Sequence, residues 1–519
     1  MKNQAWCPRP LLRGQMIEAE YHDPLIPDYC GNPLTEALPP IWLKEQVVDL
    51  LQYYPDYQDA HRTWPTELRL HLIRNVLKFF EVLPIHIDLE QRLSSMLRLG
   101  YEARNPLPLD FYRNIDRRVD ALKFERPLAS NLQSSALGLA VVGLSGVGKS
   151  LTLQRLLMLY PQVIFHHHYR GQEFSHVQVA WLKLECPFDG STKGLCLNFF
   201  QALDDLLETN NVENYARRGR ATTDEMIAGM ARVASLHSLG VLVIDEIQHL
   251  SEAKSGGSRK MLNFFVELVN KIGMPVILVG TYKAMSLLNS EFRQARRSAG
   301  LGDLVWDSMK EDQTWDLFLE SLWRYQYTKT ECPLTRQLSH TLYDVSQGIT
   351  DLAVKVYMLA QARAMTRGDE AITASVIRSV AHDSLRLARP ILDALKSGNI
   401  QELHKVDDIL PVDIELFLKE IVRTSNSASS ALPTSSPVDS GEKAKVDRRV
   451  DPKAQTARPL PEPESRGSSI QELTPPAASP NTLQGMAAEG YQRNSPVFDA
   501  LQEAGYLATD DEHLRKSDS

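Results

Sequence analysis

A glycine-rich turn between an apolar run and a helical segment constrains the fold of this chain more than any other feature. Residues 138–143 are apolar and of strand length, and residues 143–150 read GLSGVGKS. This is the G-x-x-x-x-G-K-S pattern of a phosphate-binding loop, whose glycines let backbone N–H groups curl around a phosphate. The helix that follows adds a partial positive charge at its N-terminus. The pattern therefore predicts a nucleoside triphosphate at the end of a strand in an α/β fold.

The individual positions of this loop predict a division of roles. Lys149 is expected to reach the β- and γ-phosphate oxygens of ATP, and the Ser150 hydroxyl to hold Mg²⁺. The predicted nucleotide-binding residues are Gly143, Ser145, Gly146, Val147, Gly148, Lys149, Ser150 and Leu151.

A second apolar run ends in two adjacent carboxylates. Residues 241–244 read VLVI and are followed by Asp245 and Glu246, as in a buried parallel strand that delivers acids at its carboxyl end. Asp245 is expected to help hold Mg²⁺, and Glu246 to orient or deprotonate the attacking water. The alternative is a simple helix N-cap, but the upstream phosphate loop favours the catalytic interpretation.

The order of predicted elements indicates the fold class. Strands at 138–143, 177–185, 240–245, 275–280 and 303–306 alternate with helices at 149–159, 193–208, 258–272 and 283–296. This alternation predicts a parallel, doubly wound sheet over residues 136–308. Residues 309–423 then show only helical patterns, at 312–326, 335–346, 350–366, 372–380 and 383–397. An α/β core followed by an all-helical lid resembles the layout of AAA+ P-loop NTPases.

The two ends of the chain have a different character. Residues 1–135 begin with an extended, proline-containing stretch and continue with helical patterns at 66–80 and 88–99, which predicts a docking or packing region. Residues 424–490 are rich in proline and serine and are expected to be disordered. Residues 491–519 regain apolar side chains at near-helical spacing, which favours either a short partner-binding motif or a tail without function.

Two further positions follow from the AAA+ resemblance. Thr281 follows the strand at 275–280 and occupies the sensor-1 position, where a polar side chain contacts the attacking water or the γ-phosphate. Arg293 and Arg297 precede the last strand, where AAA+ subunits carry an arginine that completes the neighbour's site. A functional arginine here implies an oligomer; the alternatives are a solvated helix face or a phosphate-contacting patch.

The lid departs from the AAA+ pattern at one position. Asp351 stands where many relatives carry the sensor-2 arginine, and Lys355 is the nearest basic residue that could replace it.

Two loops combine small residues with basic ones, which suits sequence-independent contact with the phosphates of DNA. They span residues 189–193 and 254–260. Ordinary helix-capping loops are the alternative for each. The predicted DNA-contacting residues are Ser191, Thr192, Lys193, Lys254, Arg259 and Lys260.

The segment around Asp245 and Glu246, together with several stretches outside the nucleotide motifs, resembles a particular group of ATPases, the TnsC, TniB and MuB regulators of transposition, and TnsC of heteromeric transposons above all. The resemblance spans about residues 30–400 and excludes the C-terminal tail. It is carried by 32–40 (NPLTEALPP), 196–204 (CLNFFQALD), 239–251 (LGVLVIDEIQHLS), 255–258 (SGGS), 261–266 (MLNFFV) and 296–300 (RRSAG).

This resemblance implies a regulator that binds double-stranded DNA in its ATP-loaded form and assembles on it as a ring or filament. It also implies recruitment by a target-selector protein, activation of transposase subunits and control by ATP hydrolysis. A replication-initiation or loader ATPase of the origin-recognition type is one alternative, although no compact winged-helix pattern is visible. A signalling ATPase of the immune type is another, although no repeat period is visible.

The composition agrees with such a protein. The 519 residues carry a net charge of −8, so a nucleic-acid surface would have to be a local patch. The sequence has no apolar run of about 20 residues, no apolar leader, and five scattered cysteines. We therefore expect a cytoplasmic protein without a membrane segment. The run His166–His168 does not predict a metal site, because consecutive strand residues point in different directions.

Overall fold

The computed structural model describes residues 12–128, 134–216, 221–252, 257–285, 288 and 303–398. All of them belong to one compact unit, Met1–Thr434. The predicted arginine finger (Arg293, Arg297), the predicted DNA contact Lys254 and the predicted tail at 424–519 lie outside the described residues.

A five-stranded sheet in the order β5-β6-β7-β2-β8 forms the centre of the fold, and all its strand pairs are parallel. Every residue of β2, β6 and β7 is buried, because helices cover both faces of the sheet. Its strands are β2 Gly138–Gly143, β5 Trp181–Glu185, β6 Val241–Asp245, β7 Val276–Gly280 and β8 Leu304–Trp306. The predicted AAA+ α/β core with a parallel, doubly wound sheet is confirmed.

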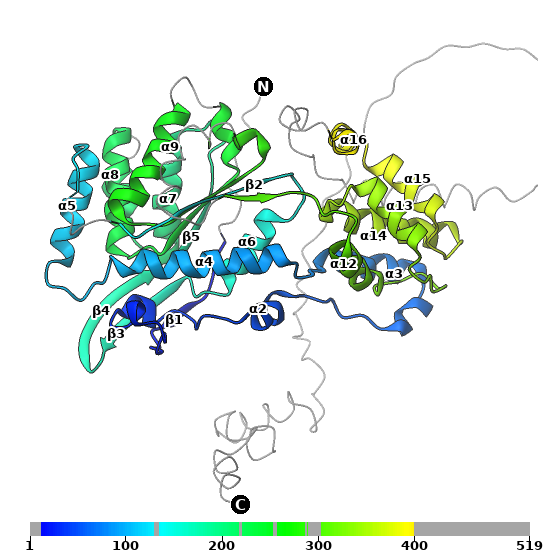
Figure 1. Ribbon diagram of the computed structural model, residues 1–519, viewed down its shortest axis with the longest axis horizontal. Helices are drawn as coiled ribbons and strands as arrows, with labels where there is room; N and C mark the ends of the chain where they lie inside the picture. The colour runs from blue at the N-terminus through cyan, green and yellow to red at the C-terminus, as the bar shows by residue number, and fades with distance from the viewer. Residues whose placement is uncertain are drawn as a thin grey trace, which may run out of the picture. The chain divides into compact units, whose positions relative to one another are not determined.

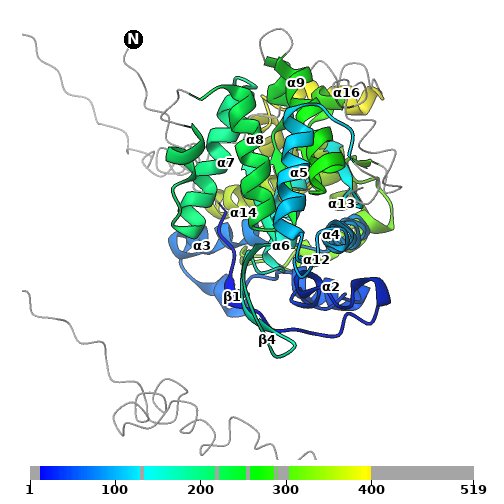
Figure 2. The same cartoon turned by 90° about the vertical axis from the view of Figure 1, so that its left-hand side faces the viewer.

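Alternating residues of each strand pack into separate cores on the two faces of the sheet. In β2, Ala140 and Val142 contribute to one core, whereas Leu139 and Val141 contribute to the other. Helices of the first core lie together in Figure 2: α5 Phe111–Lys123, α7 Thr192–Leu207, α8 Thr223–Leu236 and α9 Gly257–Glu267. Helices α4 Pro84–Glu102 and α6 Lys149–Met158 cover the opposite face (Figure 1).

A smaller three-stranded sheet was not expected from the sequence. Its order is β1-β3-β4, with β1 Met16–Glu18 parallel to β3 Val163–Tyr169 and β4 Gln172–Val179 antiparallel to it. The single strand predicted at 177–185 is wrong, because Ala180 separates β4 from β5 and the two strands enter different sheets. In β3, His166 is buried between Tyr21 and Gln178, while His167 pairs with Glu18.

The helices after β8 share one core with part of the N-terminal region. This lid comprises α12 Gln313–Trp323, α13 Arg336–Ser346, α14 Thr350–Arg367, α15 Ala374–Ser384 and α16 Arg389–Ser397. Ile73, Val76, Phe79 and Leu83 join its core. The N-terminal elements are α1 Pro33–Glu36, α2 Lys44–Leu51, α3 Thr66–Leu72 and 3₁₀ segments at Pro27–Tyr29, Asp59–Thr63 and Ile73–Lys78. Across the described ranges, no helix has the length and apolarity to cross a membrane.

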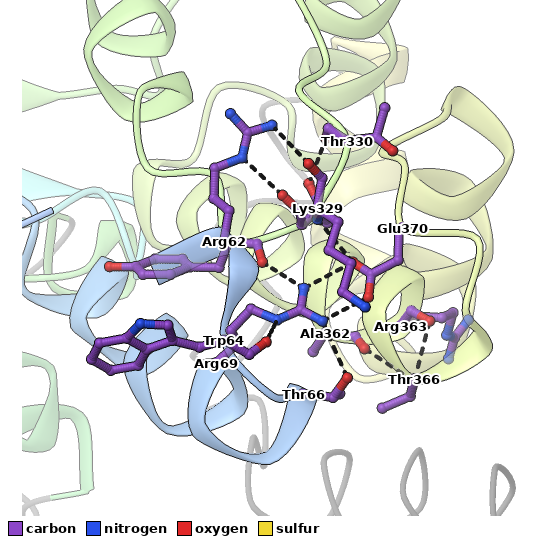
Figure 3. A network of polar contacts seen from close by, with 12 residues as sticks. Arg62, Trp64, Thr66, Arg69, Lys329, Thr330, Ala362, Arg363, Thr366 and Glu370 are labelled. Carbon is purple, nitrogen blue, oxygen red and sulfur yellow. Dashed lines mark hydrogen bonds and ion pairs between the residues drawn. The ribbon is translucent and has the colours of Figure 1, made fainter. Parts of the chain in front are cut away.

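A buried arginine fastens the N-terminal region to the lid (Figure 3). The side chain of Arg69 is fully buried, and its guanidinium donates to both carboxylate oxygens of Glu370 at 2.8 and 2.6 Å. It also donates to the carbonyl oxygens of Trp64 and Tyr327 and to the Thr66 hydroxyl. The two parallel hydrogen bonds between the Arg69 guanidinium and the Glu370 carboxylate allow one relative orientation of these side chains. Because the two residues are far apart in the sequence, this pair fixes how α3 lies on the lid.

Two buried histidines predict a loss of stability in acid. Burial lowers the pKa of His86 and of His176 from 6.5 to about 3. The unfolded chain therefore binds protons that the folded protein excludes, so stability is full above pH 6.5 and falls as the pH drops towards 3. Each residue is expected to contribute a slope of about 1.4 kcal/mol per pH unit. Urea unfolding between neutral pH and about pH 5 measures this slope.

The matched variant is His86→Gln, because a glutamine at this position can still accept the Leu83 N–H that now bonds to His86 Nδ1. This variant should lose the contribution of His86 to the pH slope. An identical pH slope in His86→Gln and the wild type would contradict the assignment.

Candidate nucleotide-binding and hydrolysis site

One cavity of about 310 Å³ is lined by all the predicted nucleotide-binding residues except Gly143. It lies where β2, β6 and β7 end, and the start of the lid helix α14 also lines it. The structure thereby brings together stretches that are far apart in the sequence. The predicted site residues on its wall are Ser145, Gly146, Val147, Gly148, Lys149, Ser150, Leu151, Asp245, Glu246 and Thr281.

The phosphate loop has the backbone that its sequence predicts. Gly146 and Gly148 have φ values of 80° and 107°, in the region that favours glycine, and Gly148 caps α6. The Lys149 side chain is buried, and its Nζ donates to the carbonyl oxygens of Gly143 and Leu144 at 3.0 and 2.6 Å. A Cβ on Gly143 would lie 1.9 Å from the Trp306 carbonyl oxygen, so this glycine allows β2 and β8 to approach.

The first of the two carboxylates, at the end of β6, is held from two sides. Asp245 is 4% exposed. One carboxylate oxygen lies 2.8 Å from the ammonium of Lys183 on β5, and the other accepts the backbone N–H of Glu246 at 3.0 Å. Lys183 is not among the predicted site residues, although a lysine within the otherwise apolar start of β5 was a usable signal.

The second carboxylate is linked to β7 by a glutamine. Glu246 has a φ of 57°, a left-handed conformation that non-glycine residues retain only where their surroundings demand it. The Gln248 side chain donates from Nε2 to Glu246 Oε2. Its Oε1 accepts the backbone N–H of Thr281 at 3.2 Å. Gln248 thus connects Glu246 with Thr281, whose sensor-1 role stays a prediction. Gln248 itself carried no recognised signal in the sequence.

The lid helix touches the phosphate loop directly. The backbone N–H of Asp351 and the Thr350 hydroxyl both donate to the Gly146 carbonyl oxygen, at 3.1 and 3.2 Å. The Asp351 carboxylate pairs with Lys355 at 2.6 Å. Lys355, the predicted substitute for the sensor-2 arginine, is therefore paired with Asp351, which occupies the position of that arginine.

An apolar wall of the cavity comes from the N-terminal region and was not predicted. Its members are Leu77, Phe79, Phe80, Leu83 and, from α12, Phe318. Such a wall suits the flat, apolar face of a nucleotide base. In the sequence, these residues showed only the apolar spacing of a helix, and the same spacing is typical of residues in a hydrophobic core.

The predicted DNA-contacting residues that are described lie in different settings. Ser191 caps α7 by accepting the Gly194 N–H, and Thr192 is buried with 8% of its surface exposed. Arg259 is exposed on α9, and Lys260 pairs with Asp224 at 2.8 Å. Lys193 is half-buried. These positions leave DNA contact as a prediction.

The side chains of the cavity fit ATP and Mg²⁺. Gly146 and Gly148 line the cavity with φ values that favour glycine, so a phosphate can approach their backbone without an intervening side chain. The Ser150 hydroxyl and the Asp245 carboxylate share the cavity, and both are oxygen donors of the kind that Mg²⁺ prefers. A bound Mg²⁺ would neutralise phosphate charge and orient the γ-phosphate for attack.

Comparison with known proteins places this site in a family. Residues 132–288 match the family described as "AAA domain". This part of the chain is an AAA-type P-loop ATPase domain, a class that implies nucleotide binding. No curated protein matches the sequence.

Solved structures with a similar fold were also found. The Walker-type ATPase paby2304 of Pyrococcus abyssi is 12% identical over 61% of this chain and 88% of its own, with a TM-score of 0.34. Aeropyrum pernix ORC1 in complex with DNA is 12% identical over 64% and 88%, with a TM-score of 0.33. The RuvB Holliday junction branch migration motor of Thermotoga maritima is 14% identical over 63% and 88%, with a TM-score of 0.28. Because these scores are low, we transfer no property of these proteins to this chain.

Proposed function

We propose that this protein is an ATP-dependent regulator of transposition that assembles on double-stranded DNA and is switched by ATP hydrolysis. It would link a target-selector protein to the transposase. The observation that carries the enzymatic half is the convergence of Lys149, Asp245, Glu246 and Thr281 on one cavity. The regulatory half rests on the resemblance of six stretches, five of them outside the nucleotide motifs, to TnsC-type regulators.

The chemistry of hydrolysis follows from the chain's own residues. Lys149 would leave its loop carbonyl partners for phosphate oxygens, which are charged and therefore stronger acceptors. Glu246 would take a proton from the attacking water, while Thr281 would hold the water or the γ-phosphate.

The contact between lid and phosphate loop supports a switch rather than a simple enzyme. Thr350 and Asp351 donate hydrogen bonds to the Gly146 carbonyl oxygen. A change in the phosphate loop on ATP binding or hydrolysis would therefore move the start of α14. The predicted oligomer would need an arginine from a neighbouring copy, for which Arg293 and Arg297 stay the candidates. The loops at 189–193 and 254–260 stay the candidates for contact with DNA.

Loss of the P-loop lysine provides the test. We expect Lys149→Ala to abolish assembly on double-stranded DNA in the presence of a non-hydrolysable ATP analogue, because the phosphates lose their principal cation. Electron microscopy of the wild type and the variant with DNA measures this result. Lys310→Ala, which changes an exposed lysine outside the cavity, is the control and should assemble like the wild type.

Rings or filaments formed by Lys149→Ala as readily as by the wild type would contradict the proposal. So would a wild-type protein that binds ATP but never assembles on DNA.

A further inference from the structure

We infer that Gln248 is a positioning residue that holds the Glu246 carboxylate on the phosphate-facing side of the sheet and thereby sets the rate of ATP hydrolysis. This inference rests on the proposed hydrolysis and extends it to a residue outside the Walker motifs. Gln248 is 5% exposed and lies in the 3₁₀ segment Ile247–Glu252 that follows β6.

The chemistry of its two partners fixes the orientation of the Gln248 amide. An ionised carboxylate only accepts hydrogen bonds, so Glu246 must face the amide nitrogen. A backbone N–H only donates, so Thr281 must face the amide oxygen. The observed contacts, from Nε2 to Glu246 and from Thr281 N to Oε1, satisfy both requirements at once. If the amide were rotated by 180°, its oxygen would face the Glu246 carboxylate and its NH₂ group would face the Thr281 N–H. Neither pair could form a hydrogen bond.

The order of the strands determines towards which side of the sheet Gln248 holds the Glu246 carboxylate. Strand β7 lies between β6, which delivers Glu246, and β2, which leads into the phosphate loop. A link from Glu246 to Thr281, the residue after β7, therefore draws the carboxylate towards the phosphate side. The neighbouring Asp245 is paired instead with Lys183 on β5, on the other side of β6. Adjacent carboxylates are thus held in opposite directions along the sheet edge.

The backbone at Glu246 and Gly280 leaves space for the Gln248 side chain between the two elements. Glu246 has its φ in the left-handed region, at the point where β6 ends and the 3₁₀ segment begins. A Cβ on Gly280, the last residue of β7, would lie 2.9 Å from Gln248 Oε1 and 2.6 Å from Ile247 Cγ2. The glycine at this position therefore permits the close approach of the 3₁₀ segment to β7.

The test compares two replacements of Gln248. Gln248→Ala removes the side chain, and Gln248→Met keeps its approximate volume without the amide. Both are expected to lower kcat on the order of 10²-fold, because small misplacements of a catalytic group cost that much. Affinity for a fluorescent ATP analogue and KM should stay at wild-type values, whereas the melting temperature should fall slightly, because a buried side chain with two hydrogen bonds is altered. Gln337→Ala, at an exposed position on α13, is the matched control and should leave all four quantities unchanged.

A second measurement separates positioning from an independent role. If Gln248 acts only through Glu246, adding Gln248→Ala to Glu246→Gln should cause no further loss of kcat. An additive loss in the double variant would overturn the inference.

Wild-type kcat in Gln248→Met would show that the amide bonds do not matter and would overturn the inference while leaving the proposed hydrolysis intact. Parallel losses of ATP affinity and melting temperature would show a packing role and overturn it as well. A wild-type protein that does not hydrolyse ATP would refute the proposed function itself.

Discussion

Glu246→Gln is expected to bind ATP as the wild type does and to lower kcat by about 10²–10⁴-fold. The glutamine keeps the shape of the side chain and can still accept the hydrogen bond from Gln248, but it cannot take a proton from water. If hydrolysis limits the lifetime of the assembly, the ATP-loaded variant should remain on DNA longer than the wild type. Phosphate release and dissociation from labelled DNA measure the two effects.

The control for this variant is Glu320→Gln on α12, where the same change falls on an exposed position. Rapid release of Glu246→Gln from DNA in the presence of ATP would argue against Glu246 as the water-activating residue. Unchanged phosphate release would do the same.

Arg69→Met is expected to destabilise the folded protein by about 3–5 kcal/mol, because it leaves a mostly buried carboxylate without its partner. The Glu370 side chain is only 14% exposed and receives two hydrogen bonds from Arg69 (Figure 3). The carbonyl oxygen of Tyr327 would lose its Arg69 donor as well. Urea unfolding followed by tryptophan fluorescence measures the change.

Arg62→Met is the matched control, since Arg62 lies in the same N-terminal region but pairs with the exposed Glu331. It should cost about 1 kcal/mol. Equal losses in Arg62→Met and Arg69→Met would contradict the importance of the buried pair. The double variant Arg69→Met with Glu370→Leu should recover part of the loss, because no buried charge then remains unpaired.

The same pair predicts a dependence on pH. Burial raises the pKa of the Glu370 carboxyl, but hydrogen bonds from Arg69 and from the Lys329 N–H outweigh burial and lower it below its ordinary value of 4.5. A carboxyl whose pKa falls on folding contributes stability above pH 4.5 and loses it as the pH falls through the lower, folded-state pKa. The difference between Arg69→Met and the wild type should therefore shrink in acid.

The sequence predicted well where one segment carries its own structural signal. The strand at 138–143 coincides with β2, and the helix at 350–366 closely matches α14 Thr350–Arg367. The β3–β4 hairpin and α8 were missed. The hairpin turns at Arg170 and Gly171. It was missed because the sequence pairs that most strongly predict a two-residue turn are of the Asn-Gly type. The strand at 177–185 was predicted as one, because apolar periodicity does not reveal a change of sheet.

The candidate site shows the same division. By itself the sequence determined the pattern of the phosphate loop and the pair of carboxylates at the end of β6, because each is recognised from particular residues at fixed local spacing. Only the tertiary structure decided that Lys183 pairs with Asp245, that Gln248 joins Glu246 to Thr281, and that lid and N-terminal residues close the cavity. The physical reason is that these contacts join side chains from different elements, and their partners are chosen by strand order and core packing.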